Sequence, residues 1–239
     1  MDLLRDKVAI VTGASSGIGR GIADVFVDEG AKLVLAARNQ MKLDQARDEL
    51  QSKGRGSAIA VPTDVRNEKE VIALFERTKS EFGRLDILVN NAGTGVTAPI
   101  EETTLEMWHR TLDTNLTGPF LCTREALKIM KPQRGGRIIN IGSISAQVPR
   151  PNSVAYACSK RGLAALTRAT ALEGRSYGVV ASCLHPGNVA TEMDPNPGEP
   201  VMAVKDFVNA VLTMATLPSH VNMLETIVLP VTQAYLGRG

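Results

Sequence analysis

The chain of 239 residues is poor in aromatic side chains, cysteine and excess charge. Its net charge is only +2, and so small an excess does not suggest a nucleic-acid partner. Its cysteines, Cys122, Cys158 and Cys183, are an odd number without CxxC spacing, which excludes a disulfide framework and the usual zinc sites. We expect them to be small core residues in a reducing compartment, and we expect no metal.

Long hydrophobic runs are also missing. Residues 1–7 contain no apolar stretch of signal-peptide length, and no segment is apolar for long enough to span a bilayer. The sequence therefore predicts a soluble, cytoplasmic protein without a membrane partner. Its densest basic stretch is typical of a solvated helix end and turn, and comprises Lys128, Lys131, Arg134 and Arg137.

What the chain does have is a regular alternation of short apolar runs with longer segments of helical periodicity. Seven runs predict strands, at 8–11, 33–35, 58–61, 85–89, 137–141, 179–184 and 224–229. Helical segments lie between them, with long ones over 105–130 and 153–176. Because the strands are apolar throughout, both faces of the sheet should be covered. We expect an α/β fold with a doubly wound parallel sheet in a single domain, residues 1–239.

A glycine-rich turn follows the first strand, in the sequence Thr12-Gly13-Ala14-Ser15-Ser16-Gly17-Ile18-Gly19. Glycines there let a ligand approach the backbone, and the N-terminus of the following helix attracts phosphate. The spacing is not that of a P-loop, because no Gly-Lys-Ser/Thr follows. The motif predicts a dinucleotide site, with a tight turn that holds no ligand as the alternative.

The end of the second strand indicates which dinucleotide is bound. A carboxylate at this place would bind the ribose 2′-hydroxyl of NAD, whereas an arginine accommodates the 2′-phosphate of NADP. The strand here ends at Arg38 without a carboxylate. The sequence therefore predicts NADP(H), unless Arg38 is only a solvated surface charge.

Further polar and glycine residues follow three other strands. Asn90-Asn91-Ala92-Gly93 follows the fourth, Ser143 the fifth and Pro186-Gly187 the sixth. Carboxyl ends of parallel strands share one edge of the sheet, so these residues should lie together. Beyond Ser143, Tyr156 and Lys160 are one helical turn apart, which brings a positive charge near the phenol.

In these motifs, taken in order and spacing, the chain resembles the compact, single-domain branch of the short-chain dehydrogenase/reductase family, over nearly its whole length. The resemblance implies a Rossmann-type fold and hydride transfer between NADP(H) and a carbonyl or alcohol. It makes Tyr156 the general acid or base, and it has Lys160 bind the nicotinamide ribose. Ser143 would bind the substrate oxygen, with Ser145 and Tyr156 as the other substrate-binding residues.

The resemblance also makes Asn115 catalytic, as the holder of a water that links Lys160 to solvent. Pro119 has no N–H to bond the Asn115 carbonyl, so that carbonyl is freed for such a water. A plain proline kink is the alternative.

The cofactor-binding set implied in this way combines the glycine loop, the strand ends and the catalytic pair. It comprises Gly13, Ser15, Ser16, Gly17, Ile18, Gly19, Arg38, Asp64, Val65, Asn91, Ala92, Gly93, Tyr156, Lys160, Pro186, Gly187, Val189 and Thr191. Asp64 would contact the adenine, with a helix N-cap as the alternative.

The substrate is less well indicated. The segment 144–150, Thr94, Gly95 and the loop 193–200 should flank it. Arg150 either binds a carboxylate of the substrate or is an exposed charge. The last strand lacks the glycine-rich ending common in ketoacyl reductases. We therefore expect an NADPH-dependent carbonyl reductase acting on a small molecule, as a homo-oligomer (a tetramer or dimer). A 3-ketoacyl thioester reductase, a non-catalytic NADPH-binding regulator and a structural partner in a complex remain as alternatives.

Overall fold

The computed structural model describes residues 2–191 and 198–235 of the chain. Within these residues, seven strands form one sheet in the order β3-β2-β1-β4-β5-β6-β7, and every neighbouring pair is parallel. The strands are β1 (Val8–Thr12), β2 (Lys32–Ala37), β3 (Ser57–Pro62), β4 (Ile87–Asn90), β5 (Gly136–Ile141), β6 (Val179–Pro186) and β7 (Glu225–Val228). The doubly wound parallel sheet predicted from the alternating pattern is confirmed.

The strands are apolar throughout because both faces of the sheet are covered. In β1, Ala9 and Val11 belong to one buried cluster, whereas Val8 and Ile10 belong to a cluster on the opposite face. All four side chains are almost completely buried. Successive side chains of a strand point to opposite faces, so a strand at the centre of two layers needs an apolar residue at every position.

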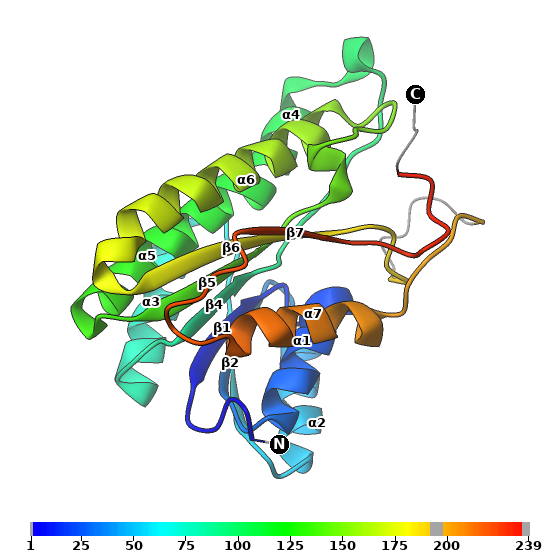
Figure 1. Ribbon diagram of the computed structural model, residues 1–239. Coiled ribbons are helices and arrows are strands. Elements are labelled where there is room, and N and C mark those ends of the chain that lie inside the picture. The colour runs from blue at the N-terminus through cyan, green and yellow to red at the C-terminus, as the bar shows by residue number, and fades with distance from the viewer. Residues whose placement is uncertain (1, 192–197, 236–239) are drawn as a thin grey trace.

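The helices divide between the two faces. Figure 1 shows α1, α2 and α7 on one side of the sheet and α3, α5 and α6 on the other. The helices are α1 (Gly17–Asp28), α2 (Gln40–Ser52), α3 (Glu68–Phe82), α4 (Leu105–Leu112), α5 (Gly118–Gln133), α6 (Val154–Gly174) and α7 (Val204–Thr216). In the described part of the chain, none of them is long and apolar enough to cross a membrane.

The helix expected over 105–130 is not continuous. A π-helical turn, Asp113–Thr117, separates α4 from α5, and the N–H of Gly118 bonds the carbonyl of Asp113 five residues back. Pro119 explains the change in part, because its missing N–H breaks the regular hydrogen-bond series at Asn115.

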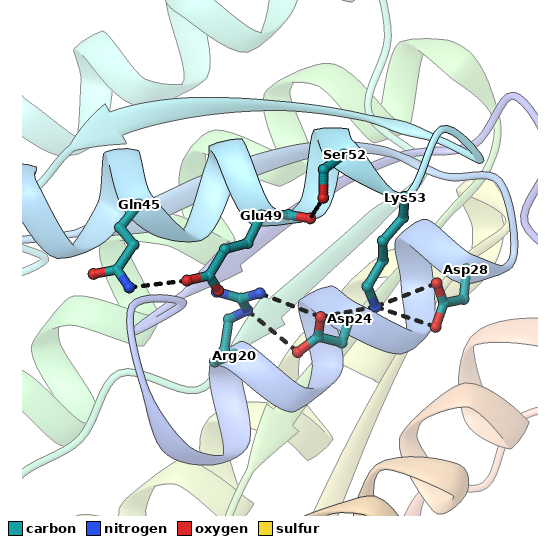
Figure 2. Close-up of polar contacts among 7 residues, drawn as sticks. All are labelled: Arg20, Asp24, Asp28, Gln45, Glu49, Ser52 and Lys53. Atoms are coloured by element: carbon teal, nitrogen blue, oxygen red, sulfur yellow. Dashed lines mark hydrogen bonds and ion pairs between the residues drawn. The ribbon is translucent and has the colours of Figure 1, made fainter.

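A group of charged side chains ties α1 to α2 (Figure 2). The guanidinium of Arg20 lies 3.2 Å from Asp24 and 2.8 Å from Glu49 of α2. Lys53, just after α2, lies 2.9 Å from Asp24 and 3.3 Å from Asp28. Hydrogen bonds, one of them from Arg20, lower the pKa of Glu49. Single surface ion pairs stabilise a protein little, but this network joins α1, from its first turn to its last residue, to the end of α2.

Two sequence expectations about single side chains are wrong. Arg137 is not solvated: it lies in β5 with 6% exposure, and its guanidinium donates to the carbonyls of Leu217, Pro218 and Val221. Cys158 is exposed on α6, whereas the other two cysteines are buried as expected.

The order of the strands determines where a ligand can bind. The chain runs from β1 outward to β2 and β3, then crosses to β4 on the other side of β1. The loops after β1 and β4 therefore diverge, and such a switch point opens a crevice at the carboxyl ends of the strands.

Candidate functional site

A cavity of about 910 Å³ opens at this switch point. Its wall is formed by the segments that follow the strands and by α6. The predicted cofactor residues on its wall are Gly13, Ser15, Ser16, Gly17, Ile18, Arg38, Asp64, Val65, Asn91, Ala92, Gly93, Tyr156, Lys160, Pro186 and Thr191. The structure thus brings motifs from across the whole sequence around one cavity.

The glycine loop is held against the loop after β4. Gly13 has φ +67°, and a Cβ there would lie 2.9 Å from the Cα of Ala92. The side-chain amide of Asn91 donates to the carbonyl of Thr12 at 2.9 Å. The Thr12 hydroxyl in turn accepts the N–H groups of Asn91 and Ala92 at 3.0 and 3.1 Å. Only glycine satisfies both the positive φ and the close approach at position 13.

The start of α1 faces the same cavity. Its N-cap residue, Ser16, makes no side-chain capping hydrogen bond. The first turn of a helix has N–H groups without partners inside the helix, together with the positive end of the helix dipole. With no capping side chain competing for them, these groups suit an anionic ligand such as a pyrophosphate.

Two cations stand at the end of β2. Arg38 is exposed on the cavity wall, and Lys42 lies on the same wall in the first turn of α2. Asn39 caps α2 by accepting the N–H of Lys42 at 3.0 Å, which fixes this turn. Lys42 was missed in the sequence, although its spacing of four residues from Arg38 was a usable signal.

Asp64 is held by its neighbour Arg66. The guanidinium of Arg66 donates three bonds to the two carboxylate oxygens, at 2.5 to 3.0 Å, and its backbone N–H adds a fourth. This pairing lowers the pKa of the Asp64 carboxyl and raises the pKa of Arg66. The alternative role of Asp64 as a helix N-cap is wrong, because Asn67 caps α3 by accepting the N–H of Lys69.

Tyr156 and Lys160 lie one turn apart on α6. The Lys160 ammonium is 5.7 Å from the centroid of the Tyr156 ring. Lys160 is only 4% exposed, and its Nζ donates to the carbonyl of Ile141, at the end of β5, at 2.8 Å. The charge is therefore anchored to the sheet edge beneath the phenol rather than free in solvent.

Asn115 lies in the π-helical turn and is fully buried. Its side-chain amide both donates to and accepts from the backbone of Thr94, each at 2.8 Å, and donates to Ser159 at 3.1 Å. A Cβ on Gly93 would lie 3.5 Å from Oδ1 of Asn115 and 3.8 Å from Nζ of Lys160. Asn115 and Lys160 therefore approach each other across Gly93.

Ser143 and Ser145 lie just behind the wall, each 7% exposed. The Ser143 hydroxyl accepts the N–H of Ser145 at 3.1 Å, which starts a short 3-10 turn, Ile144–Ala146. Because Oγ is the acceptor in that bond, the hydroxyl proton stays available for another oxygen.

Three predicted cofactor residues are absent from the described cavity wall and pack elsewhere. A Cβ on Gly19 would overlap the carbonyl oxygen of Gly13, so Gly19 lets α1 approach its own loop. Gly187 similarly lies against the Gln233 side chain. Val189 is buried in the core cluster beside Met202, with which it forms an isolated β-bridge.

Other wall residues carry no motif and were missed for that reason. Arg110 of α4 and Thr114 of the π-helical turn are one turn apart, and they close the wall beside Arg66. The remaining unpredicted wall residues are Ala37, Asn39, Thr63, Ile141 and Gly142. Thr94 and Gly95, which were expected to flank the substrate, also line the wall.

Arg150 differs from both sequence interpretations. Its guanidinium donates to the two carboxylate oxygens of Glu199 at 2.8 and 2.5 Å, and to Asn188 at 3.1 Å. It thereby links the segment after β5 to the segment after β6, on either side of the expected substrate position. Of the expected loop 193–200, residues 193–197 lie outside the described residues.

Comparisons with known proteins agree with this geometry. A family model described as short chain dehydrogenase matches residues 7–200. The chain is 38% identical over 234 residues, 97% of its length, to an uncharacterized oxidoreductase of Staphylococcus aureus (strain MW2), which it covers completely, at 100%. An uncharacterized oxidoreductase of Staphylococcus saprophyticus is 36% identical over 95% of this chain and 99% of that one. The crystal structure of a dehydrogenase/reductase from Sinorhizobium meliloti 1021 matches with a TM-score of 0.88 and 31% identity, over 95% of each chain.

Proposed function

Because this chain is an oxidoreductase of the short-chain dehydrogenase/reductase family, we propose that it is an NADPH-dependent carbonyl reductase. Members of the family use a nicotinamide cofactor, NAD or NADP. The observation that carries the proposal is one cavity with the glycine loop and Arg38 on its wall together with Tyr156 and Lys160. A dinucleotide site and an acid with a neighbouring cation therefore share one space.

The residues around the cavity fit such a cofactor. The uncapped N-terminus of α1 suits its pyrophosphate, and Asp64, whose carboxylate is paired with Arg66, would contact the adenine. Thr191, on the same wall, would hold the carboxamide end of the nicotinamide together with Val189. When bound, the nicotinamide supplies or accepts hydride at the substrate carbon.

Tyr156 would give its proton to the carbonyl oxygen as negative charge develops there, and would take it back in alcohol oxidation. The Lys160 ammonium, 5.7 Å from the ring centroid, favours the phenolate that remains. Ser143 would donate its hydroxyl proton to the same substrate oxygen, since its Oγ already accepts the N–H of Ser145. Ser145 therefore orients Ser143 for the substrate.

Asn115 would connect Lys160 to solvent through a water. Its side-chain amide is occupied by the backbone of Thr94, so the backbone carbonyl is the atom for this role. Pro119 cannot donate to that carbonyl. Reprotonation of Tyr156 after each turnover would then pass along Lys160 and this water.

Arg38 would recognise the 2′-phosphate of NADP, with Lys42 as a second cation. Replacing Arg38 by alanine should raise KM for NADPH by about ten- to a hundredfold, the loss expected when a charge-assisted bond is removed. KM for NADH should change little, because NADH has no phosphate at that position. Initial rates with each cofactor measure both values.

The matched control is Arg55→Ala. Arg55 is also exposed, but it precedes β3 and so lies at the amino ends of the strands, away from the cavity at their carboxyl ends. It should leave both KM values unchanged. If Arg38→Ala raised KM for NADPH and for NADH by the same factor, Arg38 would not recognise the 2′-phosphate.

The substrate class is proposed to be a small ketone or the corresponding secondary alcohol. The test is a panel of simple ketones, diketones and one 3-ketoacyl thioester, each incubated with NADPH. Turnover is measured as the loss of absorbance at the nicotinamide band. Turnover of simple ketones supports the proposal. A marked preference for the thioester would assign a ketoacyl reductase, and NADPH binding without any turnover would assign a regulator.

We also propose that the protein is a cytoplasmic homo-oligomer, a dimer or tetramer. Leu105 of α4, Phe120 of α5 and Leu172 of α6 are large apolar side chains with 71%, 46% and 60% exposure, on neighbouring helices. Burying them between subunits would stabilise an assembly. The described cysteines are all free, which suits a reducing compartment.

A further inference from the structure

Behind Ser143 lies a buried histidine that the proposed mechanism does not use. His185 is the penultimate residue of β6 and is completely buried. Its Nδ1 lies 3.2 Å from the backbone nitrogen of Ser143 and 2.9 Å from the backbone oxygen of the same residue. The ring thus contacts both backbone polar groups of the residue that would bind the substrate oxygen.

Room for this ring comes from Gly142. A Cβ at position 142 would lie 2.5 Å from Nδ1 and 2.8 Å from Cε1 of His185, distances that real side chains do not tolerate. Gly142 is also on the cavity wall. The histidine therefore packs directly against the backbone turn that presents Ser143.

The other ring nitrogen faces a carboxylate. Nε2 lies 3.2 Å from Oε1 of Glu225, the first residue of β7, although without the alignment of a good hydrogen bond. Glu225 also accepts from Gln147 at 3.1 Å and pairs with Arg168 of α6 at 2.5 Å. Arg168 and other hydrogen-bond partners lower the pKa of Glu225, against the opposing effect of burial.

An ionised carboxylate next to Nε2 favours a proton on that nitrogen. Nδ1 of the neutral ring is then an acceptor and can bind only the N–H of Ser143. Once protonated, Nδ1 becomes a donor and can bind only the Ser143 carbonyl, which already accepts the N–H of Ala146 at 3.0 Å. The protonation state of the ring therefore decides which backbone group of Ser143 is held.

We propose that His185, oriented by Glu225, is a positioning residue that holds Ser143 through its backbone N–H and exchanges that bond for one to the Ser143 carbonyl when the imidazole is protonated. The proposal rests on the proposed function for its kinetic consequence, since it assigns Ser143 to the substrate oxygen. The chain Ser143–His185–Glu225–Arg168 also joins this residue to α6, the helix of Tyr156 and Lys160.

The charged groups around the ring set the direction of its response to pH. Burial lowers the pKa of His185 most. The hydrogen bond to the backbone of Ser143 and the carboxylate of Glu225 raise it, and Lys160 of α6 lowers it further, so that the net shift is downward. Arg168 is paired with Glu225, and the nearby thiol of Cys183 stays neutral because burial raises its pKa to about 12. The neutral ring, which holds the N–H of Ser143, is thus the form present at neutral pH.

The kinetic test compares His185→Leu with His185→Asn at saturating NADPH. Leucine removes the acceptor, so kcat should fall about ten- to a hundredfold, as expected for a displaced catalytic group, with KM for NADPH unchanged. Asparagine keeps an acceptor near the place of Nδ1 and should recover most of the loss. Because burial lowers the pKa of His185, the wild type should also lose kcat, but only at a pH clearly below about 6.5, the ordinary histidine pKa, and His185→Asn should lack that limb.

His220→Leu is the matched control, because His220 is exposed in a turn beyond α7. It should leave kcat and its pH profile unchanged. A folded His185→Leu variant that keeps wild-type kcat would overturn the proposal, and so would an Asn variant no better than Leu.

A second measurement needs neither turnover nor a variant of His185. In wild-type protein with ¹⁵N-labelled histidine, nuclear magnetic resonance should find His185 at pH 7.5 with its proton on Nε2 and none on Nδ1. A proton on Nδ1 at that pH would overturn the proposal even if the enzyme is active. Conversely, failure of the ketone panel would remove the proposed function while this measurement still tests the contact with Ser143.

Discussion

Replacing Tyr156 by phenylalanine should lower the turnover of a ketone with NADPH by about a thousandfold, within the range lost when a general acid is removed. The ring would keep its place on α6, because only the hydroxyl is deleted and Lys160 stays anchored to the carbonyl of Ile141. NADPH should therefore still bind, with a Kd affected far less than the turnover. Initial rates measure the first effect, and quenching of protein fluorescence or enhancement of NADPH fluorescence measures the second.

Tyr177→Phe is the matched control. Tyr177 lies in the turn beyond the far end of α6, about 30 Å along the helix, where its ring contacts Lys131 and Arg134. Loss of its hydroxyl should leave kcat unchanged. A folded Tyr156→Phe variant with wild-type turnover would falsify the role of Tyr156 as the acid.

Replacing Gly19 by alanine should both destabilise the protein and weaken NADPH binding. Inside a helix alanine is ordinarily favoured over glycine by about 1 kcal/mol. Here the added Cβ would overlap the carbonyl oxygen of Gly13, and it would also meet the side-chain amide of Asn91. Overpacking of this kind costs about 1–3 kcal/mol, so helix α1 and its loop must separate.

Because that loop would hold the pyrophosphate, we expect the Kd for NADPH to rise about tenfold or more. A net loss of about 1 kcal/mol should lower Tm by about 2–4 °C in a chain of this length. Thermal unfolding and fluorescence titration measure the two effects.

Gly135→Ala is the control, since a Cβ added at Gly135 would meet no atom within 4 Å and the residue has no positive φ. An unchanged Tm and Kd in Gly19→Ala would contradict the close approach of Gly19 to the carbonyl of Gly13.

The sheet and most of its helices could be predicted because their signal is local. Val8 to Val11 are apolar on both faces of β1, and such a run is typical of a buried parallel strand. The glycine loop and the Tyr156–Lys160 pair could likewise be predicted, because each depends on the backbone geometry of only a few consecutive residues. Placing them at one edge then needs only the rule that parallel strands end together.

The parts that could not be predicted depend on partners far away in the sequence. Arg137 is buried because carbonyls some 80 residues later accept its guanidinium, as the bond to Leu217 shows at a separation of 80 residues. Arg150 is paired because Glu199, 49 residues later, reaches it. No local pattern distinguishes such arginines from solvated ones.

Asp64 shows the opposite case, in which two local interpretations competed. An aspartate before a helix is a common N-cap, but Asn67 stands closer to the start of α3 and takes that role. Asp64 is then left for Arg66 and the cavity wall. A strong N-cap candidate three residues later was the signal that could have separated the two.

The π-helical turn at Asp113–Thr117 has a consequence for how this chain tolerates insertions and deletions. A turn with five-residue spacing holds one residue more than the α-helix it interrupts, so α4 and α5 are out of phase by about 100°. Deleting one residue there would bring α4 and α5 into phase, although Pro119 would still leave a gap in the hydrogen-bond series. The deletion would also rotate Asn115 away from Thr94 and Lys160. We therefore expect that this stretch of the chain does not tolerate the deletion of one residue, because the deletion would also disrupt the geometry around Lys160.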